Sequence, residues 1–212
     1  MIRFGVIGAG RIGKVHTATI ASNPKAQLAY IADAMPKAAE ELAAKHGAKV
    51  ASVDEIMKAK DVDAVLIGSP TGFHAEQIQA ASNAGKAIMC EKPVSLSVDM
   101  IHQTLKVVEK NKSTLMIGFN RRFDPNFAEL ERRIRAGAVG EVEMVTVISR
   151  DPAPPPAEYV KGSGGLFRDM MIHDFDMARF LMGEEFVVVQ ALGSSLVDKA
   201  IGEAHQRVHN AC

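Results

Sequence analysis

The sequence predicts an α/β fold in which a doubly wound parallel sheet is followed by a smaller second domain of different pattern. Over residues 1–118, short apolar runs alternate with longer segments of helical periodicity, which is typical of parallel strands covered by helices on both faces. A glycine-rich turn, Gly8–Gly13, follows the first apolar run and opens a helical segment. Beyond Gly118 this alternation stops, and a proline cluster at 152–156 interrupts the chain.

Within residues 1–118, turn residues separate each expected strand from the next expected helix. The expected strands are Ile2–Ile7, Gln27–Ala32, Ala64–Ile67, Ala87–Cys90 and Thr114–Ile117. The expected helices are Arg11–Ser22, Pro36–His46, a segment beginning at the capping box Ser52–Glu55, His74–Ala84 and Ser97–Lys110.

The remaining residues predict a different domain. We expect helices at Pro125–Arg135 and Leu166–Met182, and strands at Glu141–Ser149 and Phe186–Leu192. We place the domain boundary near residue 119, which divides the chain into residues 1–118, residues 119–204 and a tail at 205–212.

Composition excludes several classes of protein. The 212 residues contain 25 Lys and Arg against 25 Asp and Glu, so no net charge attracts nucleic acid or an anionic membrane. No apolar run approaches the roughly 20 residues of a membrane span, and the first residues do not form a signal peptide. Two cysteines provide no disulfide framework, which indicates a reducing compartment, and we expect a cytoplasmic protein.

The glycine turn indicates a dinucleotide site. Gly8, Gly10 and Gly13, with Arg11 and Ile12 between them, have the G-x-G-x-x-G spacing that lets backbone N–H groups approach a pyrophosphate at a helix N-terminus. Asp33 ends the second strand 20 residues after Gly13, where an acid accepts hydrogen bonds from a ribose 2′-OH. Its charge favours NAD over NADP, with Lys37 the one nearby cation that would oppose this.

The alternative is a glycine turn in an unrelated α/β domain, with Asp33 a solvated strand end. We weigh the cofactor reading more heavily because strand, glycines, helix and acid all agree. His16 and His46 are expected to be surface or capping residues rather than ligands.

Glu91 and Lys92 follow the buried strand Ala87–Cys90, at the strand end where ligands of α/β sheets gather. A lysine there can orient a substrate hydroxyl and relay a proton. The alternative is a surface turn whose Glu and Lys are only solvated. The four residues Cys90–Pro93 alone do not distinguish these two interpretations.

The helix at 166–182 is apolar nearly all round, yet Asp169, His173 and Asp176 share one stripe at i, i+4 and i+7. Histidine suits proton transfer near neutral pH, and oxidation of an alcohol needs a base for the hydroxyl proton. The alternative is a satisfied internal Asp–His pair, or an Asp176 that only caps or pairs.

Two further patterns are weaker. His205 and His209 have the H-x-x-x-H spacing of a zinc site, but no third ligand or helical context supports it, and we expect no metal. The arginines between 121 and 135 are interleaved with acids, so we expect a solvated helix face with Arg122 as the exception.

Taken together, these motifs resemble the Gfo/Idh/MocA family of NAD(P)-dependent oxidoreductases. The resemblance runs from Met1 to about Ala204 through the glycine turn, Ser69-Pro70-Thr71, Glu91-Lys92-Pro93 and Asp169-x-x-x-His173-Asp174, all in family order. The segment 150–156, followed by 164–169, resembles the inositol 2-dehydrogenase branch.

The resemblance implies an NAD-binding Rossmann domain at 1–118. It also implies a partial substrate and oligomerisation domain at 119–204, an α+β domain with an open, mostly antiparallel sheet that usually assembles tetramers. It implies NAD-dependent oxidation of myo-inositol to the 2-keto sugar, with His173 as general base, Asp169 orienting it and Lys92 binding the hydroxyl. It further places Arg122 and Asp151 against the polyol. It places a second group of residues along the nicotinamide ribose: Ser69, Thr71, His74 and Glu91.

The chain departs from the family at its end, because 205–212 no longer resembles it and members continue further. We expect a truncated gene product or an altered reading frame, and hence a second domain with exposed strand edges. Two other functions stay open: an NAD(H)-binding protein without a competent substrate pocket, and a family relative that acts on another sugar or a diol.

Overall fold

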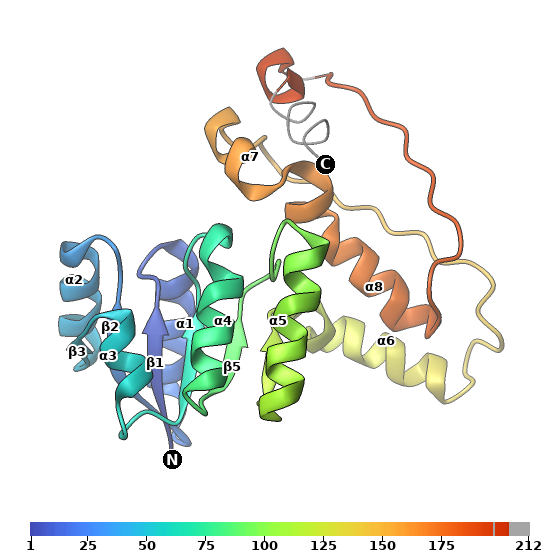
Figure 1. The fold of residues 1–212 in the computed structure, drawn as a ribbon. Coiled ribbons are helices and arrows are strands. Elements are labelled where there is room, and N and C mark those ends of the chain that lie inside the picture. The colour runs from blue at the N-terminus through green and yellow to red at the C-terminus, as the bar shows by residue number, and fades with distance from the viewer. Residues whose placement is uncertain (197, 204–212) are drawn as a thin grey trace. The chain divides into compact units, whose positions relative to one another are not determined.

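The computed structural model describes residues 1–196 and 198–203, and the chain divides into two compact units. The first unit is Met1–Gly118 and the second begins at Phe119 (Figure 1). Among the described residues, no helix combines the length and the apolar character needed to cross a membrane.

The first unit contains a six-stranded parallel sheet with the order β3-β2-β1-β4-β5-β6 (Figure 1). Its strands are β1 Ile2–Ile7, β2 Ala26–Ala32, β3 Lys49–Val50, β4 Ala64–Ile67, β5 Ala87–Cys90 and β6 Leu115–Ile117. The parallel sheet predicted from the sequence is therefore confirmed. The short edge strand β3 was not predicted, because two residues are too few to show a periodicity.

Helices connect the strands, and several begin or end at the residues that local chemistry favours. They are α1 Arg11–Ser22, α2 Pro36–His46, α3 Val53–Lys58, α4 His74–Asn83 and α5 Val98–Asn111, with a 3₁₀ turn, η1, at Thr71–Phe73. Pro36 occupies the first turn of α2, and Gly47 ends that helix in the left-handed region. The predicted capping box is formed: Ser52 Oγ accepts from the Glu55 N–H, and the Ser52 N–H donates to the Glu55 carboxylate.

The core lies on both faces of this sheet. Neighbouring residues of one strand, such as Val6 and Ile7 or Leu66 and Ile67, belong to opposite clusters because side chains alternate along a strand. One cluster includes residues of α3, α4 and α5, and the other includes residues of α1 and α2. This double burial explains why the strands read as continuous apolar runs.

The second unit contains helices and extended segments. The elements are a 3₁₀ turn, η2, at Asn120–Phe123, α6 Pro125–Arg135, α7 Ala157–Ser163, a π-helical turn, η3, at Leu166–Met170, and α8 Ile172–Met182. The helix predicted at Pro125–Arg135 is confirmed, and the Asp124 carboxylate caps its N-terminus. The helix α7 was not predicted.

Two sequence predictions fail in this unit. The single helix expected at Leu166–Met182 is divided: the Met171 N–H donates to the Leu166 carbonyl, a wider turn that interrupts the α-helical spacing before α8. The open antiparallel sheet is also not found among the described residues, since neither Glu141–Ser149 nor Phe186–Leu192 forms a strand. Their composition favours strands, but a strand also needs a hydrogen-bonded partner.

Candidate cofactor site and catalytic residues

The glycine turn between β1 and α1 has the geometry of a phosphate cradle. Gly8 adopts a positive φ of 105°, and a Cβ there would lie 2.4 Å from the Gly68 carbonyl oxygen. A Cβ on Gly13 would lie 1.9 Å from the Gly8 carbonyl oxygen. A Cβ on Gly10 would meet nothing within 4 Å, so open space lies in front of the N-terminus of α1.

The same helix end is open to a ligand. No side chain caps α1 at Gly10, and the first turn carries no acidic residue that would repel an anion. Arg11 is exposed and Ile12 is partly exposed at this end. Uncapped N–H groups and a favourable helix dipole together suit a pyrophosphate.

Asp33 lies just beyond the end of β2 and is bonded to the glycine turn. One carboxylate oxygen accepts a hydrogen bond from the Ala9 N–H at 2.6 Å, and the other accepts from the Met35 N–H at 2.7 Å. A carboxylate has about four lone-pair sites, so these two bonds fix its orientation and leave capacity for ribose hydroxyls. The predicted strand, turn, helix and acid therefore come together at one edge of the sheet.

The turn after β5 contains the next predicted residues. Glu91 Oε1 lies 2.6 Å from His16 Nε2 of α1, and both side chains are largely buried. Burial would raise the pKa of Glu91, but the hydrogen bond and charge of His16, with the N–H and charge of Lys92, hold that pKa below its ordinary value. His16 was predicted to be a surface or capping residue, and this contact corrects that prediction.

His16 could have been found from the sequence only through the fold. It lies on the second turn of a helix whose start is at the carboxyl edge of the sheet, and Glu91 ends a strand at that same edge. The separation of 75 positions hides this pairing from any local pattern.

Ser69, Thr71 and His74 follow β4. Ser69 Oγ donates to Gln77 Oε1 at 2.6 Å, and Thr71 opens η1. His74 is only 1% exposed, and its ring nitrogens lie 2.7 Å from the Pro93 carbonyl oxygen and 2.8 Å from the Ser69 carbonyl oxygen. Both ring nitrogens of His74 thus face backbone carbonyls, and its place along the nicotinamide ribose stays a prediction.

In the second unit, the buried carboxylate of Asp176 forms an ion pair with Arg122, whose side chain is 38% exposed. Arg122 Nε and Nη2 donate to the two Asp176 oxygens at 2.8 and 2.6 Å, and the guanidinium lies 5.1 Å from the Phe180 ring centre. The hydrogen bonds that Arg122 donates to Asp176 raise the pKa of Arg122, although burial opposes this. Asp176 of the predicted stripe is thus a paired residue, which is one of the alternatives considered for it.

The three predicted catalytic residues are divided between the units. Lys92 belongs to the first unit, whereas Asp169 lies in the π-helical turn and His173 on the first turn of α8. The His173 ring packs edge-on against Phe119, with ring centres 6.5 Å apart. Next to His173, Asp174 is paired with Arg121 of η2, which also donates to Ser149 Oγ.

Other predicted positions are more peripheral. Asp151 is exposed at the start of the proline cluster. Within residues 1–196 and 198–203, no group of three or more His, Cys, Asp or Glu side chains is arranged to hold a metal ion. His205 and His209 lie outside the described residues.

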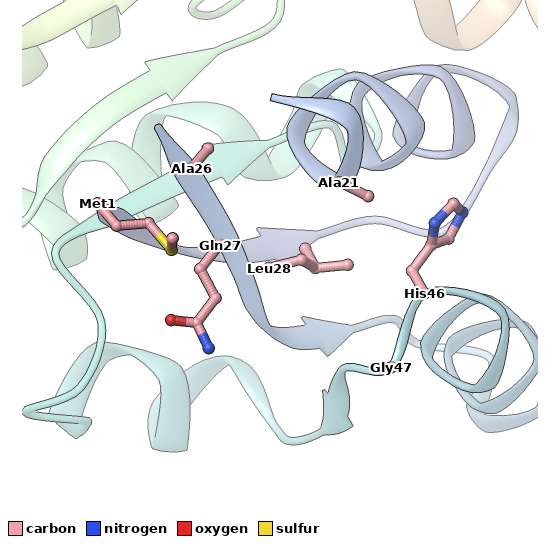
Figure 2. Close-up of a pocket in the computed structure, with 7 residues that line it drawn as sticks. All are labelled: Met1, Ala21, Ala26, Gln27, Leu28, His46 and Gly47. Carbon is pink, nitrogen blue, oxygen red and sulfur yellow. The ribbon is translucent and has the colours of Figure 1, made fainter. Parts of the chain in front are cut away.

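Two hollows are found among the described residues. A depression of about 420 Å³ is lined by Met1, Gln27, Leu28 and His46, at the amino ends of β1 and β2 (Figure 2). It is therefore at the opposite edge of the sheet from the glycine turn. A groove of about 620 Å³ in the second unit runs between α6, α8 and the extended segment 139–150.

The parallel sheet, the cradle at Gly8–Gly13 and the fixed Asp33 define a nucleotide-binding domain of the Rossmann class. Residues 2–119 match the oxidoreductase family described as GFO/IDH/MocA with an NAD-binding Rossmann fold, and residues 127–210 match the C-terminal domain of the same family. The chain belongs to the Gfo/Idh/MocA oxidoreductase family, as its motifs suggested.

Among its relatives is the inositol 2-dehydrogenase of Rhizobium meliloti, 55% identical over 96% of this chain and 62% of that protein. The myo-inositol 2-dehydrogenase of Thermotoga maritima is 43% identical over 96% of this chain and 61% of its own length. The scyllo-inositol dehydrogenase of Lactobacillus casei, solved with NAD(H) and scyllo-inositol, superposes with a TM-score of 0.88. It is 34% identical and covers 96% of this chain and 63% of its own. The chain thus spans about 60% of the length of these relatives.

Proposed function

We propose that this chain takes part in NAD-dependent oxidation of myo-inositol, or a related cyclic polyol, to the 2-keto sugar. The observation that carries the proposal is the Asp33 carboxylate, bonded to the Ala9 N–H beside an uncapped helix N-terminus. That arrangement suits a cofactor with two ribose hydroxyls and a pyrophosphate. The similarity of the chain to inositol dehydrogenases supports the choice of polyol.

NAD, when bound, would supply the two-electron acceptor. His173 would remove the proton of the reacting hydroxyl, Asp169 would orient and tune the His173 imidazole, and Lys92 would bind the same hydroxyl and assist the proton relay. Histidine is suited to the first role because its ordinary pKa lies near neutral pH.

The remaining predicted residues would bind the ligands. Gly8, Gly10, Arg11, Ile12 and Gly13 would hold the pyrophosphate. Asp33 would hold the adenosine ribose and disfavour a 2′-phosphate, so that NAD is preferred over NADP. We assign the nicotinamide ribose to Ser69, Thr71, His74 and Glu91.

Arg122 and Asp151 would contact the polyol. For Arg122 the contact would come from Nη1, because Nε and Nη2 are bonded to Asp176. We also propose the homotetramer and the cytoplasmic location expected for this family.

A second candidate function is NAD(H) binding without turnover. The exposure of apolar residues in the second unit favours it, since Val187 and Leu192 are 96% and 99% exposed. A third is oxidation of another sugar or a diol, since discrimination between polyols depends on which buried polar groups a substrate leaves unpaired.

The deciding experiment is turnover of the purified chain with NAD and a panel of polyols that includes myo-inositol, with molecular mass measured on the same sample. NADH formation with myo-inositol is the expected result. Enhanced NADH fluorescence without turnover of any polyol would support the second candidate function in place of the first. Turnover of a different polyol alone would support the third.

A further inference from the structure

The turn that carries Lys92 is held on both sides by histidines. His16 of α1 contacts the side chain of Glu91, and His74 of α4 contacts the carbonyl of Pro93. We propose that His16 and His74 are positioning residues that fix the backbone of Lys92 at the carboxyl edge of the sheet. The catalytic consequence rests on the proposed function, because it requires the hydroxyl-binding role assigned to Lys92.

We call these two contacts braces, and the first brace is the contact between His16 and the Glu91 carboxylate. His16 Nε2 donates to Oε1 at 2.6 Å, and the backbone N–H of Lys92 also donates to this carboxylate. One carboxylate thus joins α1 to the turn. Because the His16 and Glu91 side chains are only 18% and 16% exposed, water competes weakly for this bond.

A neighbouring strand leaves little room for the carboxylate to move. A Cβ on Gly118, just after β6, would lie 3.1 Å from Glu91 Oε2. Glycine at this position therefore lets the backbone approach the carboxylate closely. The Glu91 side chain is confined between α1, the end of β6 and its own turn.

The second brace comes from α4. His74 spans the loops after β4 and β5, with 2.8 Å to the Ser69 carbonyl and 2.7 Å to the Pro93 carbonyl. Its burial protects these bonds from exchange with water. Lys92 lies between the two residues that the histidines hold.

A lysine that binds a reacting hydroxyl gains its effect from placement, and a displacement of about 1 Å can cost on the order of 100-fold in rate. Hydrogen bonds to the residues on either side of Lys92 restrict such displacement. The two histidines therefore act on Lys92 through its neighbours, Glu91 and Pro93.

The first test compares His16→Met with His16→Gln in the full chain. The glutamine amide nitrogen can take the place of Nε2, whereas methionine fills the space without donating. We expect the Lys92 amide to exchange its hydrogen about 10-fold faster in H16M, with H16Q close to the unsubstituted chain. His102→Met, on the exposed face of α5, is the matched control and should leave the exchange unchanged.

In turnover with myo-inositol, H16M should lower kcat by at least about 10-fold, and H16Q should restore most of it, with little change in the dissociation constant for NADH. Unchanged exchange at Lys92 in H16M overturns the brace. If no variant turns over a polyol, the proposed function fails. The exchange measurement then still tests whether His16 fixes the backbone of Lys92.

The second test separates the two bonds of His74. Asparagine places its amide nitrogen near the position of Nδ1 and keeps the donor toward Pro93, whereas glutamine reaches the position of Nε2 and keeps the donor toward Ser69. We expect H74N to retain slower exchange at Lys92 than H74Q. Faster exchange in H74N than in H74Q would overturn the role of the Pro93 bond, and circular dichroism verifies that both variants are folded.

Discussion

The two units of this chain differ in whether their extended segments are paired with neighbouring strands and buried. In the first unit all four residues of β4 are buried and every strand has a parallel neighbour. In the second unit the segment 184–196 is apolar at several positions, yet Val187 and Leu192 are almost fully exposed and no described neighbour forms a ladder with it.

This difference shows what stabilises each unit. The first unit depends on apolar burial on both faces of a sheet. In the second, the turn η2 is connected to α8 by two Arg–Asp pairs, Arg121–Asp174 and Arg122–Asp176. We therefore expect the first unit to be sensitive to cavities and the second to the loss of charge partners.

The largest expected effect is a loss of turnover that leaves NADH binding unchanged. His173→Ala should lower turnover with myo-inositol by about 10²- to 10⁴-fold, because the proposed general base is lost. NADH binding, measured by fluorescence titration, should not change, since the cofactor residues belong to the first unit. A variant that keeps full turnover would remove His173 from the proposed chemistry.

The second-largest expected effect is a loss of stability, and it concerns the Arg122–Asp176 ion pair of the second unit. Arg122→Met leaves the Asp176 carboxylate buried without its partner, and should destabilise this unit by about 2 kcal/mol. Asp176→Asn should cost less, because the Arg122 side chain is more than a third exposed and can reach water.

Urea unfolding followed by circular dichroism measures both variants. Glu185→Ala, which removes an exposed partner of Arg179, is the control and should show no measurable change. Equal stability of R122M and the unsubstituted chain would mean that this pair does not hold η2 to α8.

A matched valine pair tests the contrast in burial directly. Val65 in β4 is fully buried, whereas Val187 is 96% exposed. Val65→Ala should lower the free energy of unfolding by about 1.5 kcal/mol through lost burial and a small cavity. Val187→Ala should change it by less than about 0.5 kcal/mol, and a comparable loss at both positions would show that the segment 184–196 is covered in solution.

A smaller effect is expected at the cofactor site of the first unit. Asp33→Asn should weaken NADH binding about 5-fold and reduce the preference for NADH over NADPH, because the negative charge near the ribose is lost. Glu40→Gln, an exposed acid on α2, controls for net charge. Unchanged cofactor preference would contradict the role proposed for Asp33.

The contrast between the two units also explains which features of the structure could be predicted from the sequence. The α-helices of the first unit and all its strands except β3 were predicted because burial on both faces, Pro36, Ser52 and the glycine turn each leave a local signal. The pairing of His16 with Glu91 could not be predicted, since it joins residues 75 positions apart. Strand composition at 141–149 and 186–192 misled the prediction, because pairing depends on partners that composition does not specify.

The smallest effect concerns surface charges on α6. Hydrogen bonds from Arg132 and then Arg133 lower the pKa of Glu129 to about 2, whereas its ordinary value is 4.5. Because the folded pKa is the lower one, the stabilisation is complete above pH 4.5 and is lost as pH falls toward 2. A carboxyl NMR titration should show this pKa, and Glu129→Gln should flatten only a slight acid dependence of unfolding, since exposed pairs contribute little. A Glu129 pKa near 4.5 would mean that these arginines stay solvated, and the second unit would then depend still more on the Arg122–Asp176 pair.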